Sequence, residues 1–195
     1  KQNKIVLIFD EIITGFRTKK GSVQKQFNIK PDITLIGKIL GGGLPIGAIG
    51  ISNKIYKKMK TLKKKIFFGG TFTANTFSTF VGNNVVSYIK KNNNQVEKLI
   101  KSCEFFENKI NNFIKNNKIN AKVYRYDSIM RIVFSKGIAN NVIQRDFLEK
   151  KNSKRKIEFF KFLKKNNISY PRNGVILLSL ANNNRRDLEY IIKKI

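Results

Sequence analysis

The stretch ITLIGKILGGGLPIGAIGIS, residues 33–52, decides the fold of this chain. An apolar run over 33–36 ends just before Lys38, and three consecutive glycines precede a second apolar run over 48–51. Short β-branched runs bounded by glycine and proline are typical of buried strands. The stretch therefore predicts two strands of an α/β sheet with a glycine-rich loop between them, and it places Lys38 where the first strand ends.

Lys38 is the first candidate for chemistry. Ligands of open α/β sheets bind at the carboxyl ends of the strands, and we expect apolar surroundings there. A lysine amine in such a place can form a Schiff base with a carbonyl compound. The alternative is a solvated surface lysine, in a chain that contains 40 Lys and Arg residues. A phosphate-binding P-loop is excluded, because Asp32 stands where that motif needs glycine and Ile39 where it needs Ser or Thr.

A carboxylate follows another predicted strand. Lys4–Phe9, KIVLIF, is apolar on both faces, which is typical of parallel strands covered by helices, so we expect this strand to be buried. Asp10 lies at its carboxyl end, as Lys38 does for its own strand. Asp10 is either a helix cap or the partner of a cationic ring nitrogen in a cofactor.

Composition excludes several classes of site. The chain has 195 residues, no histidine and one cysteine, so it has no internal disulfide, no Cys/His metal site and no histidine-based triad. We expect Cys103 to be a core residue. The net charge of +28 comes from a Lys/Asn-rich composition that indicates codon bias. The alternative is a nucleic-acid binder with salt-dependent affinity. Because the basic runs are short, we expect no specific nucleic-acid partner. No apolar run is long enough to span a membrane, and we expect no membrane partner and a cytoplasmic location.

The rest of the chain shows helical and strand periodicity. Helices are predicted over Asn53–Lys60, Thr76–Lys91, Val96–Ile119, Ile157–Lys165 and Asn183–Ile195, the last capped by Asn183 or Asn184. We expect the apolar stripe of the second helix to belong to the core; it is formed by Phe77, Phe80, Val81, Val85 and Ile89. Strands are predicted over Ala121–Tyr126 and Ile129–Phe134, which form a hairpin, and over Ile168–Tyr170 and Val175–Leu180. The segment Asn140–Lys154 has no clear pattern.

Three motifs in order carry a family resemblance. They are IFDEIITGFR (8–17), PDITLIGKILGGGLPIGA (31–48) and GGTFTAN (69–75). Together they resemble the class III aminotransferases, which are pyridoxal-phosphate enzymes of fold type I, and among these they are most similar to glutamate-1-semialdehyde 2,1-aminomutase-like enzymes. The chain begins without Met at a strand entrance and resembles the C-terminal half of such an enzyme.

The resemblance assigns the site residues. It implies that Lys38 binds pyridoxal 5′-phosphate as a Schiff base and then moves a proton as acid and base. It implies that Asp10 holds the pyridine nitrogen protonated, which makes the ring an electron sink. Thr71 matches the threonine that binds the cofactor phosphate of the neighbouring subunit, which implies a homodimer, although Thr71 can also be a plain turn residue. Glu11 and Arg17 belong to the motif, and we expect structural roles for them.

The predicted fold is α/β, a partial fold type I large domain with a mostly parallel sheet, followed by a small C-terminal α+β domain. The predicted limits are 1–95 for the cofactor-binding part, 96–118 for a linking helix and 119–195 for the small domain. The implied function is transamination or intramolecular amino-group transfer on an amino acid or amino-carbonyl substrate, with a small-molecule amino donor and acceptor. The alternative is an inactive fragment that needs a front-half partner. The sequence leaves the substrate open, and also the choice between aminotransferase and aminomutase.

Overall fold

A computed structural model describes residues 5–171, 173–182 and 184–194. The chain divides into two compact units, Lys1–Val96 and Glu97–Ile195. The predicted assignment of 1–95, 96–118 and 119–195 to parts of a larger enzyme stays a prediction.

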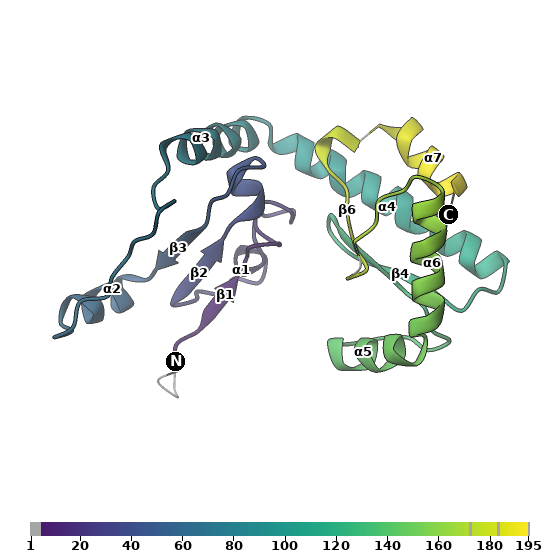
Figure 1. Ribbon diagram of the computed structural model, residues 1–195, viewed down its shortest axis with the longest axis horizontal. Coiled ribbons are helices and arrows are strands. Elements are labelled where there is room, and N and C mark those ends of the chain that lie inside the picture. The colour runs from purple at the N-terminus through teal and green to yellow at the C-terminus, as the bar shows by residue number, and fades with distance from the viewer. Residues whose placement is uncertain (1–4, 172, 183, 195) are drawn as a thin grey trace. The chain divides into compact units, whose positions relative to one another are not determined.

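The first unit is built on a three-stranded sheet in the order β1-β2-β3 (Figure 1). Strand β1 runs parallel to β2, and β3 is antiparallel to β2. The elements of this unit are β1 (Ile8–Asp10), α1 (Val23–Gln26), β2 (Ile33–Ile36), the 3₁₀ turn η1 (Lys38–Gly41), β3 (Ala48–Ile51), α2 (Asn53–Lys60) and α3 (Thr76–Lys91). Both strands predicted within residues 33–52 and the loop between them are therefore confirmed.

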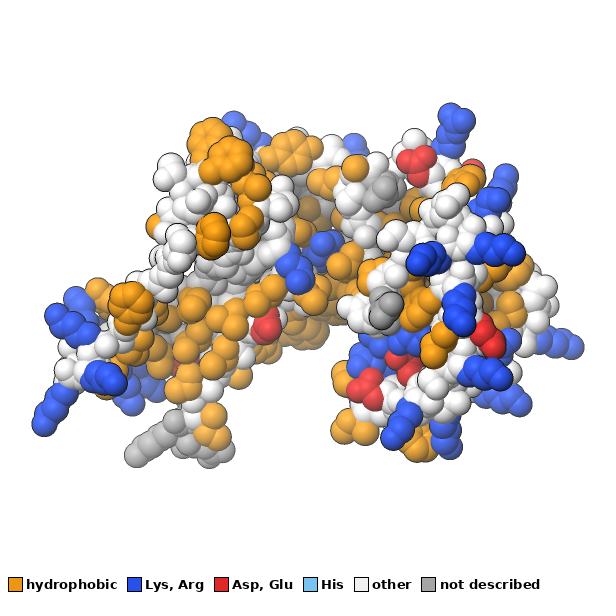
Figure 2. All heavy atoms as spheres, in the orientation of Figure 1, with side chains coloured by type: hydrophobic (Ala, Val, Ile, Leu, Met, Phe, Trp, Pro, Cys, Tyr) orange, Lys and Arg blue, Asp and Glu red, His pale blue; other side chains and the backbone are white. Residues whose placement is uncertain are grey.

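The first strand differs from its prediction in extent and in burial. It begins at Ile8 rather than Lys4, which lies outside the described residues. Ile5 is 74% exposed and Ile8 is 54% exposed. An apolar run shows what a strand could bury, but burial also needs a covering layer. Figure 2 shows apolar side chains at the surface over the strands of this unit.

Helix α3 begins and ends as predicted. Its start is fixed by Asn75, whose side chain accepts a hydrogen bond from the Ser78 amide at 3.0 Å. The prediction that its apolar stripe belongs to the core is wrong for the two phenylalanines, whereas Val81 and Val85 of the same stripe are half-buried and lie against Gly42. Phe77 and Phe80 are about two-thirds exposed, whereas Ser78 and Gly82 are buried. The small-residue face is the packed one, since it allows a close approach that larger side chains would prevent.

The second unit combines helices with an antiparallel sheet in the order β4-β5-β6. Its elements are α4 (Asn93–Asn116, which starts before the unit boundary), β4 (Lys122–Tyr126), β5 (Ile129–Val133), α5 (Val142–Lys151), α6 (Ser153–Lys165), β6 (Val175–Leu177), the 3₁₀ turn η2 (Leu180–Asn182) and α7 (Arg185–Lys194). The hairpin is confirmed. A strand over Ile168–Tyr170 is wrong, because the structure has no strand at these described residues. The segment that showed no pattern contains α5.

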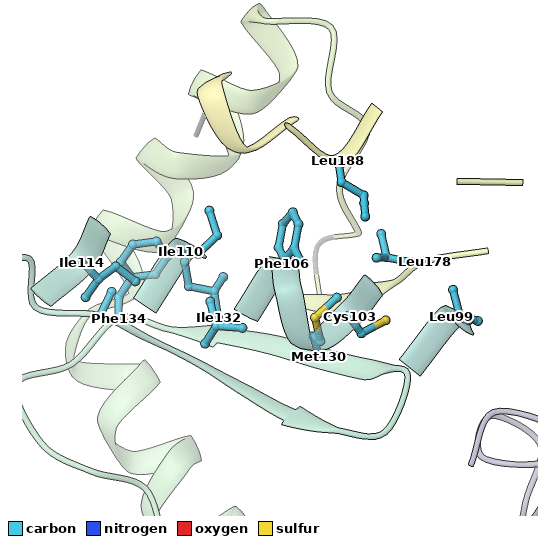
Figure 3. Packing of buried hydrophobic residues seen from close by; sticks show 12 residues of the cluster. Leu99, Cys103, Phe106, Ile110, Ile114, Met130, Ile132, Phe134, Leu178 and Leu188 are labelled. Carbon is cyan, nitrogen blue, oxygen red and sulfur yellow. The ribbon is translucent and has the colours of Figure 1, made fainter. Parts of the chain in front are cut away.

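The core of the second unit lies between α4, the sheet and α7. Figure 3 shows Cys103, Phe106 and Ile110 of α4 directed toward this core. Cys103 is fully buried, which confirms its predicted place. The helical period of the sequence therefore identified the packed face of α4. Asn184 caps α7, since its side chain accepts from the Arg186 amide at 2.9 Å; the other candidate, Asn183, lies outside the described residues.

One side chain protects the outer edge of β4. The amide of Asn111 donates to the carbonyl of Val123 at 3.0 Å and accepts from the Val123 N–H at 2.8 Å. This pair of bonds imitates a neighbouring strand. It also ties α4 to the sheet at a fixed register.

Candidate active site

The two predicted site residues of the first unit lie at the same end of adjacent strands. Asp10 is the last residue of β1 and pairs in register with Leu35 of β2. The ladder continues by one bond, from the Glu11 N–H to the Leu35 carbonyl, at 2.9 Å. Lys38 follows Leu35 by three residues, which is a rise of about 10 Å along an extended chain. Because β1 and β2 are parallel, the structure brings a carboxylate and an amine to one edge of the sheet.

The Asp10 carboxylate is exposed, and one of its two oxygens accepts a hydrogen bond. Its Oδ1 accepts from the Ile12 N–H at 3.0 Å, which closes an Asx turn after the strand. Its Oδ2 has no hydrogen-bond partner in the described part of the chain. The turn holds the side chain at the strand end, and the second oxygen is left available to a ligand.

Glu11 is the buried carboxylate that supports this turn, which agrees with the structural role expected for it. It is 1% exposed. Its Oε1 accepts from the Gln24 N–H at 2.8 Å and its Oε2 from the Val23 N–H at 3.2 Å, and it also accepts from the Thr14 hydroxyl. Glu11 thus fixes the loop from 12 to 24 against the strand that ends in Asp10.

Lys38 begins η1 with a backbone φ of 48°, a left-handed value that is uncommon for lysine. The expectation of apolar surroundings is wrong, because the residue is exposed while its neighbour Gly37 is buried. As at β1, exposure is set by the packing of neighbouring elements, which an apolar run in the sequence does not reveal. Among the described residues, no hydrogen bond or ion pair holds the Lys38 amine, so no such contact has to break before it meets a ligand.

Gly42, in the loop after Lys38, allows close packing against α3. Gly42 adopts a φ of 57°, and a β-carbon there would lie 2.8 Å from Cγ2 of Val85 on α3. From the other side, a β-carbon at Gly82 of α3 would lie 2.8 Å from the carbonyl oxygen of Leu40. Sequence reasoning missed Gly82, although a glycine inside a helical pattern is itself a signal of a close approach.

Thr71 is not brought together with the other two residues. It lies in an exposed turn over 71–74, where the Thr73 N–H donates to the Gly70 carbonyl at 2.9 Å. No hydrogen bond between described residues joins Thr71 to Asp10 or Lys38. A role toward a neighbouring subunit therefore stays a prediction.

Metal-binding groups and membrane-spanning helices are both absent from the described residues. Within 5–171, 173–182 and 184–194, no group of three or more Cys, Asp or Glu side chains could hold a metal ion. None of the helices in the same ranges is long and apolar enough to cross a membrane.

Comparison with known proteins decides the family. The model of the family described as aminotransferase class-III matches residues 1–151. The chain belongs to the class-III aminotransferases. These enzymes depend on pyridoxal phosphate, so the predicted family and its cofactor are confirmed.

The relatives are more than twice as long as this chain. A glutamate-1-semialdehyde 2,1-aminomutase of Methanosphaera stadtmanae is 34% identical over 167 residues, which is 86% of this chain and 38% of that protein. A β-phenylalanine aminotransferase from Variovorax paradoxus superposes with a TM-score of 0.84 at 20% identity, over 99% of this chain and 44% of that one. A glutamate-1-semialdehyde aminomutase from Pseudomonas aeruginosa, in complex with PMP, superposes with a TM-score of 0.81 at 14% identity, over 99% of this chain and 44% of that one.

These likenesses confirm the fold class. The chain is α/β and corresponds to a part of a fold type I pyridoxal-phosphate transaminase. It spans about 40% of the length of the proteins that it matches.

Proposed function

We propose that this chain supplies two residues of a pyridoxal-phosphate site: the lysine that binds the cofactor and the carboxylate that pairs with its ring nitrogen. The site would transfer an amino group between molecules or move it within one molecule. The observation that carries the proposal is the placement of Asp10 and Lys38 at the carboxyl ends of adjacent parallel strands. The substrate would be an amino acid or an amino-carbonyl compound. When bound, pyridoxal phosphate supplies an electron sink for the carbon that loses its proton.

The residues present fit that group. Lys38 would bind it covalently through its free Nζ, and once displaced by substrate the same nitrogen would carry a proton between carbons. Asp10 would accept a hydrogen bond from a protonated ring nitrogen with its unused Oδ2, since a carboxylate favours the charged form of a nearby base. The Asx turn and the Glu11 hydrogen bonds would keep that oxygen in place.

Thr71 would serve a second copy of the chain. The resemblance at GGTFTAN and the exposure of the 71–74 turn support a homodimer in which Thr71 binds the cofactor phosphate of the neighbouring subunit. Crosslinking at a cysteine placed at Thr71 tests this proposal. A monomer that binds the cofactor fully would contradict it.

The lysine assignment is tested by reductive trapping. The chain is mixed with pyridoxal phosphate and reduced with borohydride, and the modified peptide is found by mass spectrometry. We expect the label at Lys38, its loss in Lys38→Ala, and no loss in the matched control Lys54→Ala on α2. Trapping that persists at other lysines in Lys38→Ala, in equal amount, would defeat the assignment.

The carboxylate assignment needs a different readout. Asp10→Asn should still bind the cofactor, because it keeps the turn, but should lose most turnover, because an amide does not hold the ring nitrogen protonated. The measurement is the rate of amino-group transfer by the chain together with pyridoxal phosphate and, where the chain needs it, the remaining part of a class-III aminotransferase. Rates near those of the unaltered protein would count against this role.

A second candidate is a chain that works only with a partner polypeptide. It rests on the exposed apolar residues of β1 and of the segment before it, from Ile5 to Ile8, and on the fraction of the relatives that the chain spans. A mixing experiment separates the two: cofactor binding by the chain alone supports the first, and binding only after addition of the remaining part of a class-III aminotransferase supports the second.

A further inference from the structure

Helix α3 and the turn that carries Lys38 touch through a glycine. Gly82 is buried in the middle of α3, against the backbone of η1. A β-carbon at this position would lie 2.8 Å from the Leu40 carbonyl oxygen and 3.6 Å from Cδ1 of Ile46. The nearer atom is backbone, which cannot rotate away, so any side chain at position 82 must displace either the helix or the turn.

The turn has little freedom to absorb a displacement. It is a single 3₁₀ turn, in which the Leu40 N–H donates to the Gly37 carbonyl at 3.1 Å and the Gly42 N–H donates to the Ile39 carbonyl at 3.0 Å. Lys38 already holds a left-handed φ of 48° at its start. A shift of the Leu40 carbonyl therefore moves the backbone of Lys38, two residues earlier in the same turn.

We propose that Gly82 is a positioning residue for Lys38: its missing side chain lets α3 pack on the turn and fix the backbone of Lys38 at the end of β2, the same end of the sheet as Asp10. The inference rests on the proposed function of Lys38. A purely structural role for Gly82 predicts a different outcome: Gly82→Ala would lower the stability of the first unit, but the preference of the cofactor for Lys38 over the other lysines would not change.

The test compares Gly82→Ala with Asn83→Ala, an exposed position on the same helix. The probe is pyridoxal phosphate with borohydride reduction, and the readout is the label at Lys38 divided by the label at all other lysines. We expect this ratio to fall about tenfold in Gly82→Ala, since a misplaced reacting group loses much of its advantage. It should be unchanged in Asn83→Ala, and the helical signal should not fall in either variant.

A second readout needs no cofactor. Amide chemical shifts over residues 37–43 should change in Gly82→Ala and stay constant in Asn83→Ala. Should Gly82→Ala not fold, Gly42→Ala presses on the same helix from the turn, where its β-carbon meets side-chain ends of Val81 and Val85; only the labelling ratio is then read, because position 42 has a left-handed φ of 57° and lies within 37–43. Constant shifts in a folded variant, or an unchanged labelling ratio, would overturn the inference. An unaltered chain with no preference for Lys38 would instead refute the proposed function, while the amide shifts still decide the positioning.

Discussion

Replacing Glu149 by glutamine should destabilise the second unit by about 2–3 kcal/mol. The Glu149 carboxylate accepts from Arg131 at 2.8 and 2.7 Å and from Lys156 at 2.9 Å, and its side chain is only 11% exposed. Glutamine keeps one acceptor oxygen, but it turns an amide toward two cations that are themselves one-fifth exposed or less. The magnitude is below that of a fully buried pair, because water can reach the edges of both cations.

The same contacts set the protonation of the carboxyl. Burial raises the pKa of Glu149, but the hydrogen bonds from Arg131 and Lys156 outweigh it and hold the pKa below its usual value of 4.5. A carboxyl with a lowered pKa in the folded state stabilises the fold above its unfolded pKa, and this contribution is lost as the pH falls through the folded pKa.

The assay is urea unfolding. Hydrogen exchange of peptides from β4 and β5 monitors the transition, because these peptides report on the second unit alone. The matched control is Asp146→Asn on the same helix, where the ion pair with Arg145 spans 2.7 Å but the carboxylate is 60% exposed. We expect the control to cost less than about 0.5 kcal/mol. Equal destabilisation by the two variants would refute the argument that burial makes the Glu149 network strong.

Three further predictions follow from described contacts. The stability gap between the unaltered chain and Glu149→Gln should narrow as the pH falls below 4.5 and through the lowered pKa of Glu149, because the protonated carboxyl is neutral like the amide; the same unfolding assay measures it, and a constant gap would contradict the direction of the pKa shift. Phe106→Ala should cost about 3–5 kcal/mol in urea unfolding, because Phe106 is 2% exposed, whereas Phe113→Ala on the same helix, at 47% exposed, should cost under about 1 kcal/mol. Glu11→Ala should speed amide exchange over 12–24 about tenfold or more, because it leaves three half-buried donors unpaired. Protection equal to that of the unaltered loop would show that the carboxylate is not needed.

The second unit was the easier part to predict. The period of α4 reports burial correctly at Cys103 and Phe106, because one helix face packs on a sheet that the same unit supplies. In the first unit the positions of Asp10 and Lys38 followed from where apolar runs end, and the structure agrees. Their surroundings did not follow, since the exposure of a strand depends on layers that a run of residues cannot reveal.

Helix α3 shows a second limit of predicting burial from the sequence. Hydrophobic periodicity selects Phe77 and Phe80 as the inner face, but the buried positions are Ser78 and Gly82, because the neighbouring turn approaches with its backbone. The left-handed backbone conformation of Lys38 could not be predicted from the sequence either, because lysine has no preference for that conformation.

The amide of Asn111 has a consequence for how this chain behaves among its own copies. An outer strand with free donors and acceptors is a template on which a strand of another molecule can polymerise. At Val123 both backbone groups of the outer strand are already occupied by that one side chain. Val123 is also 1% exposed, so in the folded unit this position of the outer strand is closed to a strand from a second copy of the chain.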